Sequence, residues 1–163
     1  MRVSTRIRLG VALILILSSS LHLMQTQKTL NIKVSGPLAY ARIYADADGE
    51  SHYSDEKLTF QLVDYAPPAP PISVTEALAA ENVSFISSPS GWYGDFHPAP
   101  RRQFVFVLSG ELEVEVSDGE KRKFGPGSFV LVEDIWGKGH RSWVSSEKRS
   151  TAVVVPLSES QNK

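Results

Sequence analysis

The sequence predicts a single all-β domain, a sandwich or barrel with little helix. Short runs of apolar and β-branched residues alternate with turn residues such as Gly, Pro, Asp and Ser along most of the chain. No long stretch has the spacing of an amphipathic helix. At 163 residues, of which 42% are hydrophobic, the chain is long enough to bury one sizeable core.

The first half of the chain contains two plausible strands, Ala39 to Ala45 and Leu58 to Tyr65. They are followed by residues 66–71, where repeated proline fixes φ and removes backbone donors, so a stiff loop is expected. Residues Thr75 to Ala80 could form one turn of helix.

The second half has sharper strand signals. Residues 103–108 are almost all apolar, which is typical of a strand covered on both faces. Residues 111–116 alternate strictly between Glu and an aliphatic residue, so the glutamates are expected to face water. Ser109-Gly110 and Asp118-Gly119 are typical of the turns between such strands. Two further strands are expected at Phe129–Val132 and Thr151–Val155.

The N-terminal residues 1–27 have the layout of a secretory signal peptide or another hydrophobic segment: three arginines, an apolar run from Leu9 to Leu17, then small residues. The run is shorter than the roughly 20 residues that cross a membrane, so cleavage and export are favoured over an uncleaved membrane anchor. With a start at Met24 the protein would instead be cytoplasmic. Residues 28–72 are expected to form a polar connector, lead-in strands and the Pro-rich loop, and residues 73–163 the core of the barrel.

The amino-acid composition of the chain argues against several classes of function. The chain has no cysteine, which excludes disulfides, thiolate metal sites and a cysteine nucleophile. Its formal net charge is −1 and it shows no basic stripe, so nucleic acid is not an expected partner. Any chemistry must use histidine, carboxylate, amide or guanidinium groups.

Two segments resemble the paired motifs of the cupin family. The first runs from His97 through Pro-Ala-Pro-Arg-Arg to Gln103 and on to Gly110, and the second joins Pro126-Gly127 to Gly137-Lys-Gly-His140. The chain is similar to small bacterial cupins that carry this HPAPRRQ motif and a GKGH second motif. The resemblance implies a jelly-roll barrel, the double-stranded β-helix of a single-domain cupin.

The family's metal ligands are two histidines and a glutamate in the first motif and a histidine in the second. His97 and His140 match two of these four positions, whereas Ala99 and Gln103 stand at the other two. The ligand set implied here is His97, Gln103 and His140, with a carboxylate from Asp95 or from Asp134 as a way to complete it. Iron, manganese or zinc would be the metal.

Other candidate ligand-binding groups surround the motifs. Arg101 and Arg102 could clamp a carboxylate or phosphate at the mouth of the barrel, or be ordinary exposed side chains. The rings of Trp92 and Trp136 could stack on a planar or sugar-like ligand, or belong to the core.

Three hypotheses follow. The first is a small-molecule-binding cupin with a depleted metal site. It would hold a small ligand, which could be an anion, through His97, Gln103 and His140. The second is a metal-dependent cupin enzyme, an oxygenase or isomerase, whose metal would activate oxygen or polarise the substrate. The third is a structural or assembly role as a cupin homodimer. A membrane would be a partner only through an uncleaved N-terminal segment.

Overall fold

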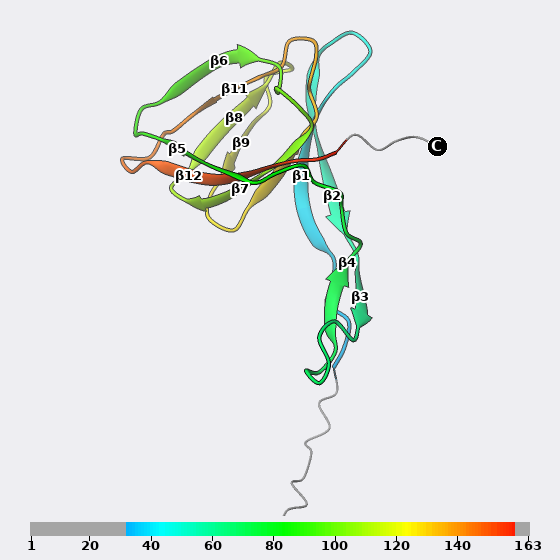
Figure 1. Cartoon of the computed structure of the whole chain (residues 1–163). Helices are drawn as coiled ribbons and strands as arrows, with labels where there is room; N and C mark the ends of the chain where they lie inside the picture. The colour runs from blue at the N-terminus through cyan, green and yellow to red at the C-terminus, as the bar shows by residue number, and fades with distance from the viewer. Residues whose placement is uncertain (1–31, 159–163) are drawn as a thin grey trace, which may run out of the picture. The chain divides into compact units, whose positions relative to one another are not determined.

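The computed structural model describes residues 32–158, and it contains twelve β-strands and no helix in that range (Figure 1). The strands are β1 (Leu38–Ala45), β2 (Ser51–Leu58), β3 (Phe60–Val63), β4 (Ile72–Thr75), β5 (Ser84–Ser88), β6 (Tyr93–His97), β7 (Gln103–Ser109), β8 (Leu112–Val116), β9 (Lys121–Phe124), β10 (Phe129–Val132), β11 (His140–Trp143) and β12 (Ser150–Pro156). The all-β prediction is confirmed. The expected helical turn at Thr75–Ala80 is wrong, because Thr75 ends β4 and residues 76–79 continue as irregular chain.

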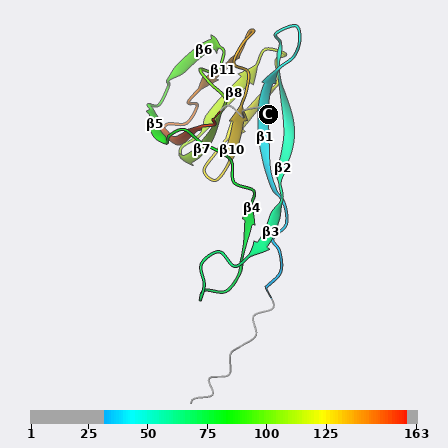
Figure 2. The ribbon, with the colours of Figure 1, turned by 45° about the vertical axis from the view of Figure 1, so that its right-hand side comes forward.

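Two sheets form the barrel. The larger has the strand order β2-β1-β10-β7-β12-β5, and the smaller has the order β6-β11-β8-β9. Strand β1 pairs in parallel with β10, while the other neighbours in these sheets are antiparallel. The lead-in strands β1 and β2 are therefore part of the larger sheet and lie beside the second half of the chain (Figure 2).

The core lies between the two sheets, because alternate residues of their central strands point inward. The larger sheet supplies residues such as Val105, Val130 and Val154, and the smaller supplies Val114 and Val116, all in one buried cluster. Strand β10 is buried at all four positions, since its other two side chains join a second cluster. The nearly unbroken apolar runs in the sequence reflect this burial on both faces.

The second cluster gathers aromatic rings of the larger sheet. Phe104 and Phe129 are buried, and Tyr40 and Phe106 pack against them. The rings of Tyr40 and Phe129 stack with centroids 5.4 Å apart, and those of Phe106 and Phe129 stack at 5.2 Å. Because these positions alternate with Val105 and Val130 of the core, the rings lie on the opposite face of the sheet.

The alternating strand β8 departs from expectation in one respect. Its glutamates do lie opposite the core valines, yet Glu115 is only 8% exposed. Arg141 contacts Glu115 Oε2 through two nitrogens, at 2.7 and 2.9 Å, and Lys121 lies 3.3 Å away. Burial by itself raises the pKa of Glu115, but these two cations together outweigh it and hold the pKa below the usual range. The prediction that the glutamates face water is wrong for Glu115, because basic side chains of the neighbouring strands cover it.

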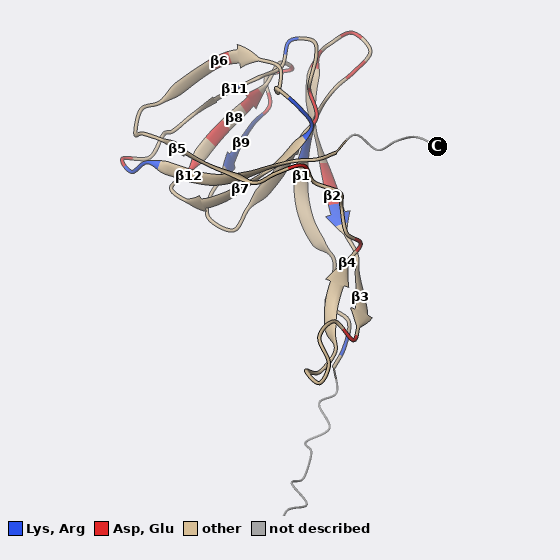
Figure 3. Ribbon diagram, in the orientation of Figure 1, with Lys and Arg blue, Asp and Glu red and all other residues tan. Residues whose placement is uncertain are grey.

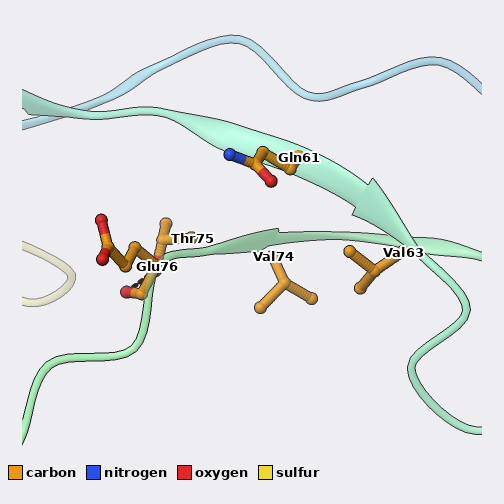
Figure 4. A pocket seen from close by; sticks show the side chains of 5 residues that line it. All are labelled: Gln61, Val63, Val74, Thr75 and Glu76. Carbon is orange, nitrogen blue, oxygen red and sulfur yellow. Dashed lines mark hydrogen bonds between the residues drawn. The ribbon is translucent and has the colours of Figure 1, made fainter.

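A two-stranded hairpin, β3–β4, extends beyond the barrel sheets (Figures 1 and 2). One of its faces carries a groove lined by Gln61, Val63, Val74, Thr75 and Glu76 (Figure 4). The predicted signal segment, residues 1–27, lies outside the described residues, and export stays a prediction. Within residues 32–158 there is no helix of the length and apolarity needed to cross a membrane.

Candidate functional site

The two motif histidines meet across neighbouring strands of the smaller sheet. His97 ends β6, His140 begins β11, and their Cα atoms are partners in the antiparallel pairing. Their ring centroids are 4.9 Å apart. Residues separated by more than forty positions in the sequence thus form one pair.

The backbone around this pair depends on a glycine and an irregularity. Gly139 has a φ of +70°, and a Cβ placed there would lie 2.0 Å from the carbonyl oxygen of His97. Only glycine allows this approach and this conformation. The register between β6 and β11 shifts between His140 and Ser142, where Asp95 and Phe96 stand opposite the single residue Arg141.

The imidazole of His97 is oriented by backbone. Its Nδ1 lies 2.6 Å from the carbonyl oxygen of Asp95. Because a carbonyl oxygen only accepts, Nδ1 donates, and Nε2 of the neutral ring carries the lone pair. The carboxylate of Asp95 accepts a hydrogen bond from the Phe96 N–H at 2.8 Å.

The imidazole of His140 is oriented by a buried carboxylate. Its Nδ1 lies 2.7 Å from Oδ2 of Asp134, whose side chain is fully buried, while that of His140 is 12% exposed. This arrangement also directs Nε2 away from the acceptor and leaves it for another partner. The second oxygen of Asp134, Oδ1, is buried and has no hydrogen-bond partner among the described residues. The carbonyl of Asp134 accepts from the Ala99 N–H at 3.0 Å, which ties the two motifs together.

The other two motif positions lie on the same barrel. Ala99 is 3% exposed and belongs to the core cluster. Gln103 is the first residue of β7 and is half-buried. It alternates with Phe104 and shares the parity of Val105 and Val107, so its amide is on the core side of the sheet.

Residues 85–156 match the model of the cupin domain. The chain contains a cupin domain. No curated protein matches the sequence.

Three solved structures that resemble the chain are distant from it in sequence. A cupin 2 conserved barrel domain protein from Salinispora arenicola CNS-205 is 19% identical, with a TM-score of 0.40 and coverage of 60% of this chain and 73% of that one. The conserved SPY1581 protein of unknown function from Streptococcus pyogenes is 23% identical, with a TM-score of 0.37 and coverage of 45% and 62%. DMSP lyase DddQ from Ruegeria pomeroyi DSS-3 is 22% identical, with a TM-score of 0.42 and coverage of 64% and 49%. The chain thus spans less than two thirds of the length of the streptococcal and Ruegeria proteins.

The donors of this cupin domain do not fit a tight cation site. Among residues 32–158, no three His, Cys, Asp or Glu side chains are grouped so that they could hold one metal ion. Two imidazoles and the amide of Gln103 lack a carboxylate to offset a divalent charge. Asp134 is placed behind His140, on Nδ1, and Asp95 orients His97 through its carbonyl, so neither carboxylate lies beside both imidazoles.

Each of the two motif arginines makes an ion pair with a glutamate. Arg101 contacts Glu81 at 2.8 Å, and Arg102 contacts Glu133, which also binds Arg42. Burial alone raises the pKa of Glu133, but the two guanidinium groups outweigh it and lower the pKa overall. A role for either arginine in ligand binding stays a prediction.

The tryptophan candidates lie at separate places. The ring of Trp92 packs over Gly94 of β6, where a Cβ would come within 2.8 Å of it. Trp136 is half-exposed and packs beside Gly49 in the β1–β2 turn. Neither is placed against His97 or His140 by these contacts, and their part in binding also stays a prediction.

One ionic cluster near the motifs was not expected from the sequence. Both ring nitrogens of His52 contact carboxylates: Nε2 lies 3.1 Å from Asp46, and Nδ1 lies 2.7 Å from Asp118. The hydrogen bond to Asp46 raises the pKa of His52 most, and the hydrogen bond to Asp118 raises it further. The acidic residues around Asp46 are visible in the sequence beside His52. The second carboxylate of the cluster, Asp118, lies far along the chain and could not be associated with them from the sequence.

This cluster is connected to the second motif. In the turn between Asp46 and Ser51, the Gly49 carbonyl accepts from the Lys138 N–H at 2.9 Å, and Glu50 pairs with Lys138. The hydroxyl of Ser51, which is fully buried, donates to the Gly139 carbonyl at 2.6 Å. The β1–β2 turn therefore holds the loop that leads into His140.

Proposed function

We propose that this cupin domain binds a small polar molecule through Nε2 of His97, Nε2 of His140 and the amide of Gln103. One observation carries the proposal: each imidazole has its Nδ1 engaged by an acceptor, and the two rings lie 4.9 Å apart. Two Nε2 atoms are thereby left for a shared partner. Histidines fixed in this way are prepared to bind, because little side-chain entropy remains to be lost.

The chemistry of these groups limits the ligand. A neutral imidazole accepts a hydrogen bond at Nε2 from a hydroxyl or amine, and a protonated one donates to a carboxylate. The amide of Gln103 can both donate and accept. A small organic acid that also carries a hydroxyl group would use all three. Arg101 and Arg102, which are 57% and 45% exposed at the side chain, would attract such an anion toward the domain.

A metal-dependent oxygenase or isomerase is the second candidate. The observation in its favour is the contact between Nδ1 of His140 and the carboxylate of Asp134. Metal-binding histidines commonly donate their other ring N–H to a carboxylate in this way. Against it stands the set of donors, which offers two imidazoles and one amide. The binding function therefore comes first.

The test uses the full-length protein purified without chelator or affinity metal, beside a His97→Ala, His140→Ala variant. Thermal shifts with a panel of small hydroxy acids and dicarboxylic acids would be measured together with elemental analysis. A ligand that raises Tm in the parent and not in the variant supports binding. Near-stoichiometric metal that is absent from the variant, together with turnover of an organic substrate, would replace this proposal with the enzyme. The absence of both would contradict each of them.

A further inference from the structure

The smaller sheet carries a hollow of about 230 Å³ that is open to solvent. This outer hollow takes its lining from all four strands of the sheet, namely Tyr93, Glu115, Lys121, Arg141 and Trp143. Glu115 alternates along β8 with Val114 and Val116, which belong to the core. The lining therefore lies on the face of the sheet that is turned away from the core and from the interior of the barrel.

Two aromatic rings form one side of the outer hollow. Tyr93 and Trp143 are partners in the pairing of β6 with β11, and their rings stack with centroids 6.5 Å apart. Tyr93 is 54% exposed, so the pair is accessible from solvent. The ammonium group of Lys121 lies 6.0 Å from the ring centroid of Trp143. Rings held in a fixed orientation give a flat apolar surface, on which the C–H groups of a sugar ring can pack.

The polar groups of the outer hollow are fixed by contacts with one another. Arg141 and Lys121 both contact Glu115, and all of these contacts are to Oε2. The Glu115 side chain is only 10% exposed, and its other oxygen, Oε1, keeps its capacity to accept a hydrogen bond. Arg141 also donates to the Tyr93 hydroxyl at 3.3 Å. Donors and an acceptor held in this way can bind hydroxyl groups with little further loss of side-chain entropy.

The charge of this face limits the kind of ligand. Two cations, Lys121 and Arg141, and one carboxylate, Glu115, leave a net charge of +1 in the outer hollow. Beside it, Lys123 pairs with Glu113 at 3.1 Å and adds no net charge. Figure 3 shows the acidic residues of β8 next to the basic residues of β9. One excess positive charge suits a ligand with a single carboxylate better than a polyanion, which the glutamates would repel.

We propose that the outer hollow is a second binding site, and that it takes a saccharide unit that carries a carboxylate, such as a uronic acid. The sugar ring packs on Tyr93 and Trp143. One of its hydroxyl groups donates to Oε1 of Glu115, and its carboxylate accepts from Lys121 and Arg141. This site lies on the other face of the sheet from the core, so it does not depend on what the barrel binds.

The first test is an NMR titration of the full-length protein with short oligomers of galacturonate. The chain has three tryptophans, and each indole N–H gives its own signal. The signal of Trp143 is expected to shift, while that of Trp136, which packs beside Gly49, stays in place. The matched ligand is the same oligomer with its carboxyl groups methyl-esterified. It is expected to bind roughly threefold more weakly, because the pairing of its carboxylate with the two cations is lost.

The second test uses variants of the lining. Tyr93→Ala removes an exposed ring and is expected to weaken galacturonate binding about tenfold. Lys121→Ala removes one cation and is expected to weaken it roughly threefold. The matched controls are Tyr65→Ala and Lys148→Ala, at exposed residues of the same types outside the smaller sheet, and they are expected to leave the affinity unchanged. Gln103→Ala, in the barrel site, should also leave it unchanged. Circular dichroism would confirm that all variants remain folded.

Three outcomes would overturn the proposal. They are the absence of any shift of the Trp143 signal, binding that Tyr93→Ala leaves unchanged, and binding that is lost in a folded Gln103→Ala variant. The last of these would place the saccharide inside the barrel instead. Equal affinities for the acid and its methyl ester would overturn the role given to the carboxylate and its two cations.

Discussion

Nδ1 of His140 lies 2.7 Å from Oδ2 of Asp134, and the Asp134 side chain is fully buried. This contact fixes the ring of a motif histidine from behind. Replacing Asp134 by alanine removes the acceptor and leaves the imidazole facing a buried, unpartnered space. The free energy of unfolding is expected to fall by about 3 kcal/mol, as for other buried pairs that lose one partner.

The control for Asp134 is Asp95→Ala. Asp95 holds His97 through its backbone carbonyl, which the substitution keeps, so the change in stability should stay within about 0.5 kcal/mol. Urea unfolding measures both variants, and the nitrogen chemical shifts of His140 report its tautomer. Equal losses in the two variants would show that the carboxylate of Asp134 has no special role.

The His52 cluster predicts a dependence of stability on pH. The pKa of His52 is raised in the folded state. The stabilisation that His52 contributes is therefore complete below the pKa of an unfolded histidine, about 6.5, and it is lost as the pH rises through the raised pKa. The parent should therefore lose Tm more steeply than His52→Gln on the alkaline side of pH 6.5. Melting curves at intervals of half a pH unit would show it, and parallel profiles would refute it.

The carboxylate partner of His52 predicts the opposite trend in acid. Hydrogen bonding to His52 lowers the pKa of Asp46 in the folded protein. The stabilisation that Asp46 contributes is therefore complete above the ordinary aspartate pKa of about 4, and it is lost as the pH falls through the lowered pKa. Asp46→Asn should flatten the acid side of the stability profile relative to the parent. An unchanged acid limb in the same melting experiment would count against this reading.

Gly139 predicts a large effect from one methyl group. Gly139→Ala would bring a Cβ within 2.0 Å of the His97 carbonyl oxygen at a φ of +70°, so strand β11 must move. A loss of about 3 kcal/mol or more is expected. Gly119→Ala is the control, because φ is +96° but nothing lies within 4 Å, and about 1 kcal/mol is expected. Similar losses in both variants would mean that the close approach to His97 is not needed.

Restoring the family's ligand residues predicts a gain of metal. Ala99→His combined with Gln103→Glu would add an imidazole and a carboxylate to His97 and His140, and the double variant is expected to retain about one equivalent of Zn²⁺ or Mn²⁺. Gln103→Glu alone separates the effect of charge from that of the buried position 99. Ala99 is 3% exposed among core valines, so circular dichroism must show that the larger side chain is accommodated. A folded double variant with no more metal than the parent would contradict the assignment of these positions.

Much of the fold was predictable from local pattern. The alternation in β8 and the apolar run of β7 reflect which faces are buried, and that information is carried by each strand itself. The glycines after these strands marked the turns, as the positive φ values of Gly110 and Gly119 confirm. The spacing of the motif from His97 to Gly110 indicated the cupin domain. The strand expected from Leu58 to Tyr65 is shorter, at Phe60–Val63, and pairs in a separate hairpin, because partners beyond the strand decide where it ends.

The sequence by itself determined the all-β class, the cupin motifs, the absence of thiol chemistry and the identity of His97 and His140. Tertiary structure alone decided their partners. The pairing of β6 with β11 brings the two rings together, and the path of the chain places Asp134 behind one ring and the Asp95 carbonyl behind the other. The contacts of His52 with Asp46 and Asp118 also depend on the tertiary structure, because Asp118 is far from the other two residues in the sequence. The reason is physical: periodicity records burial along one strand, whereas hydrogen bonds and ion pairs depend on distances of a few ångströms between strands far apart in sequence.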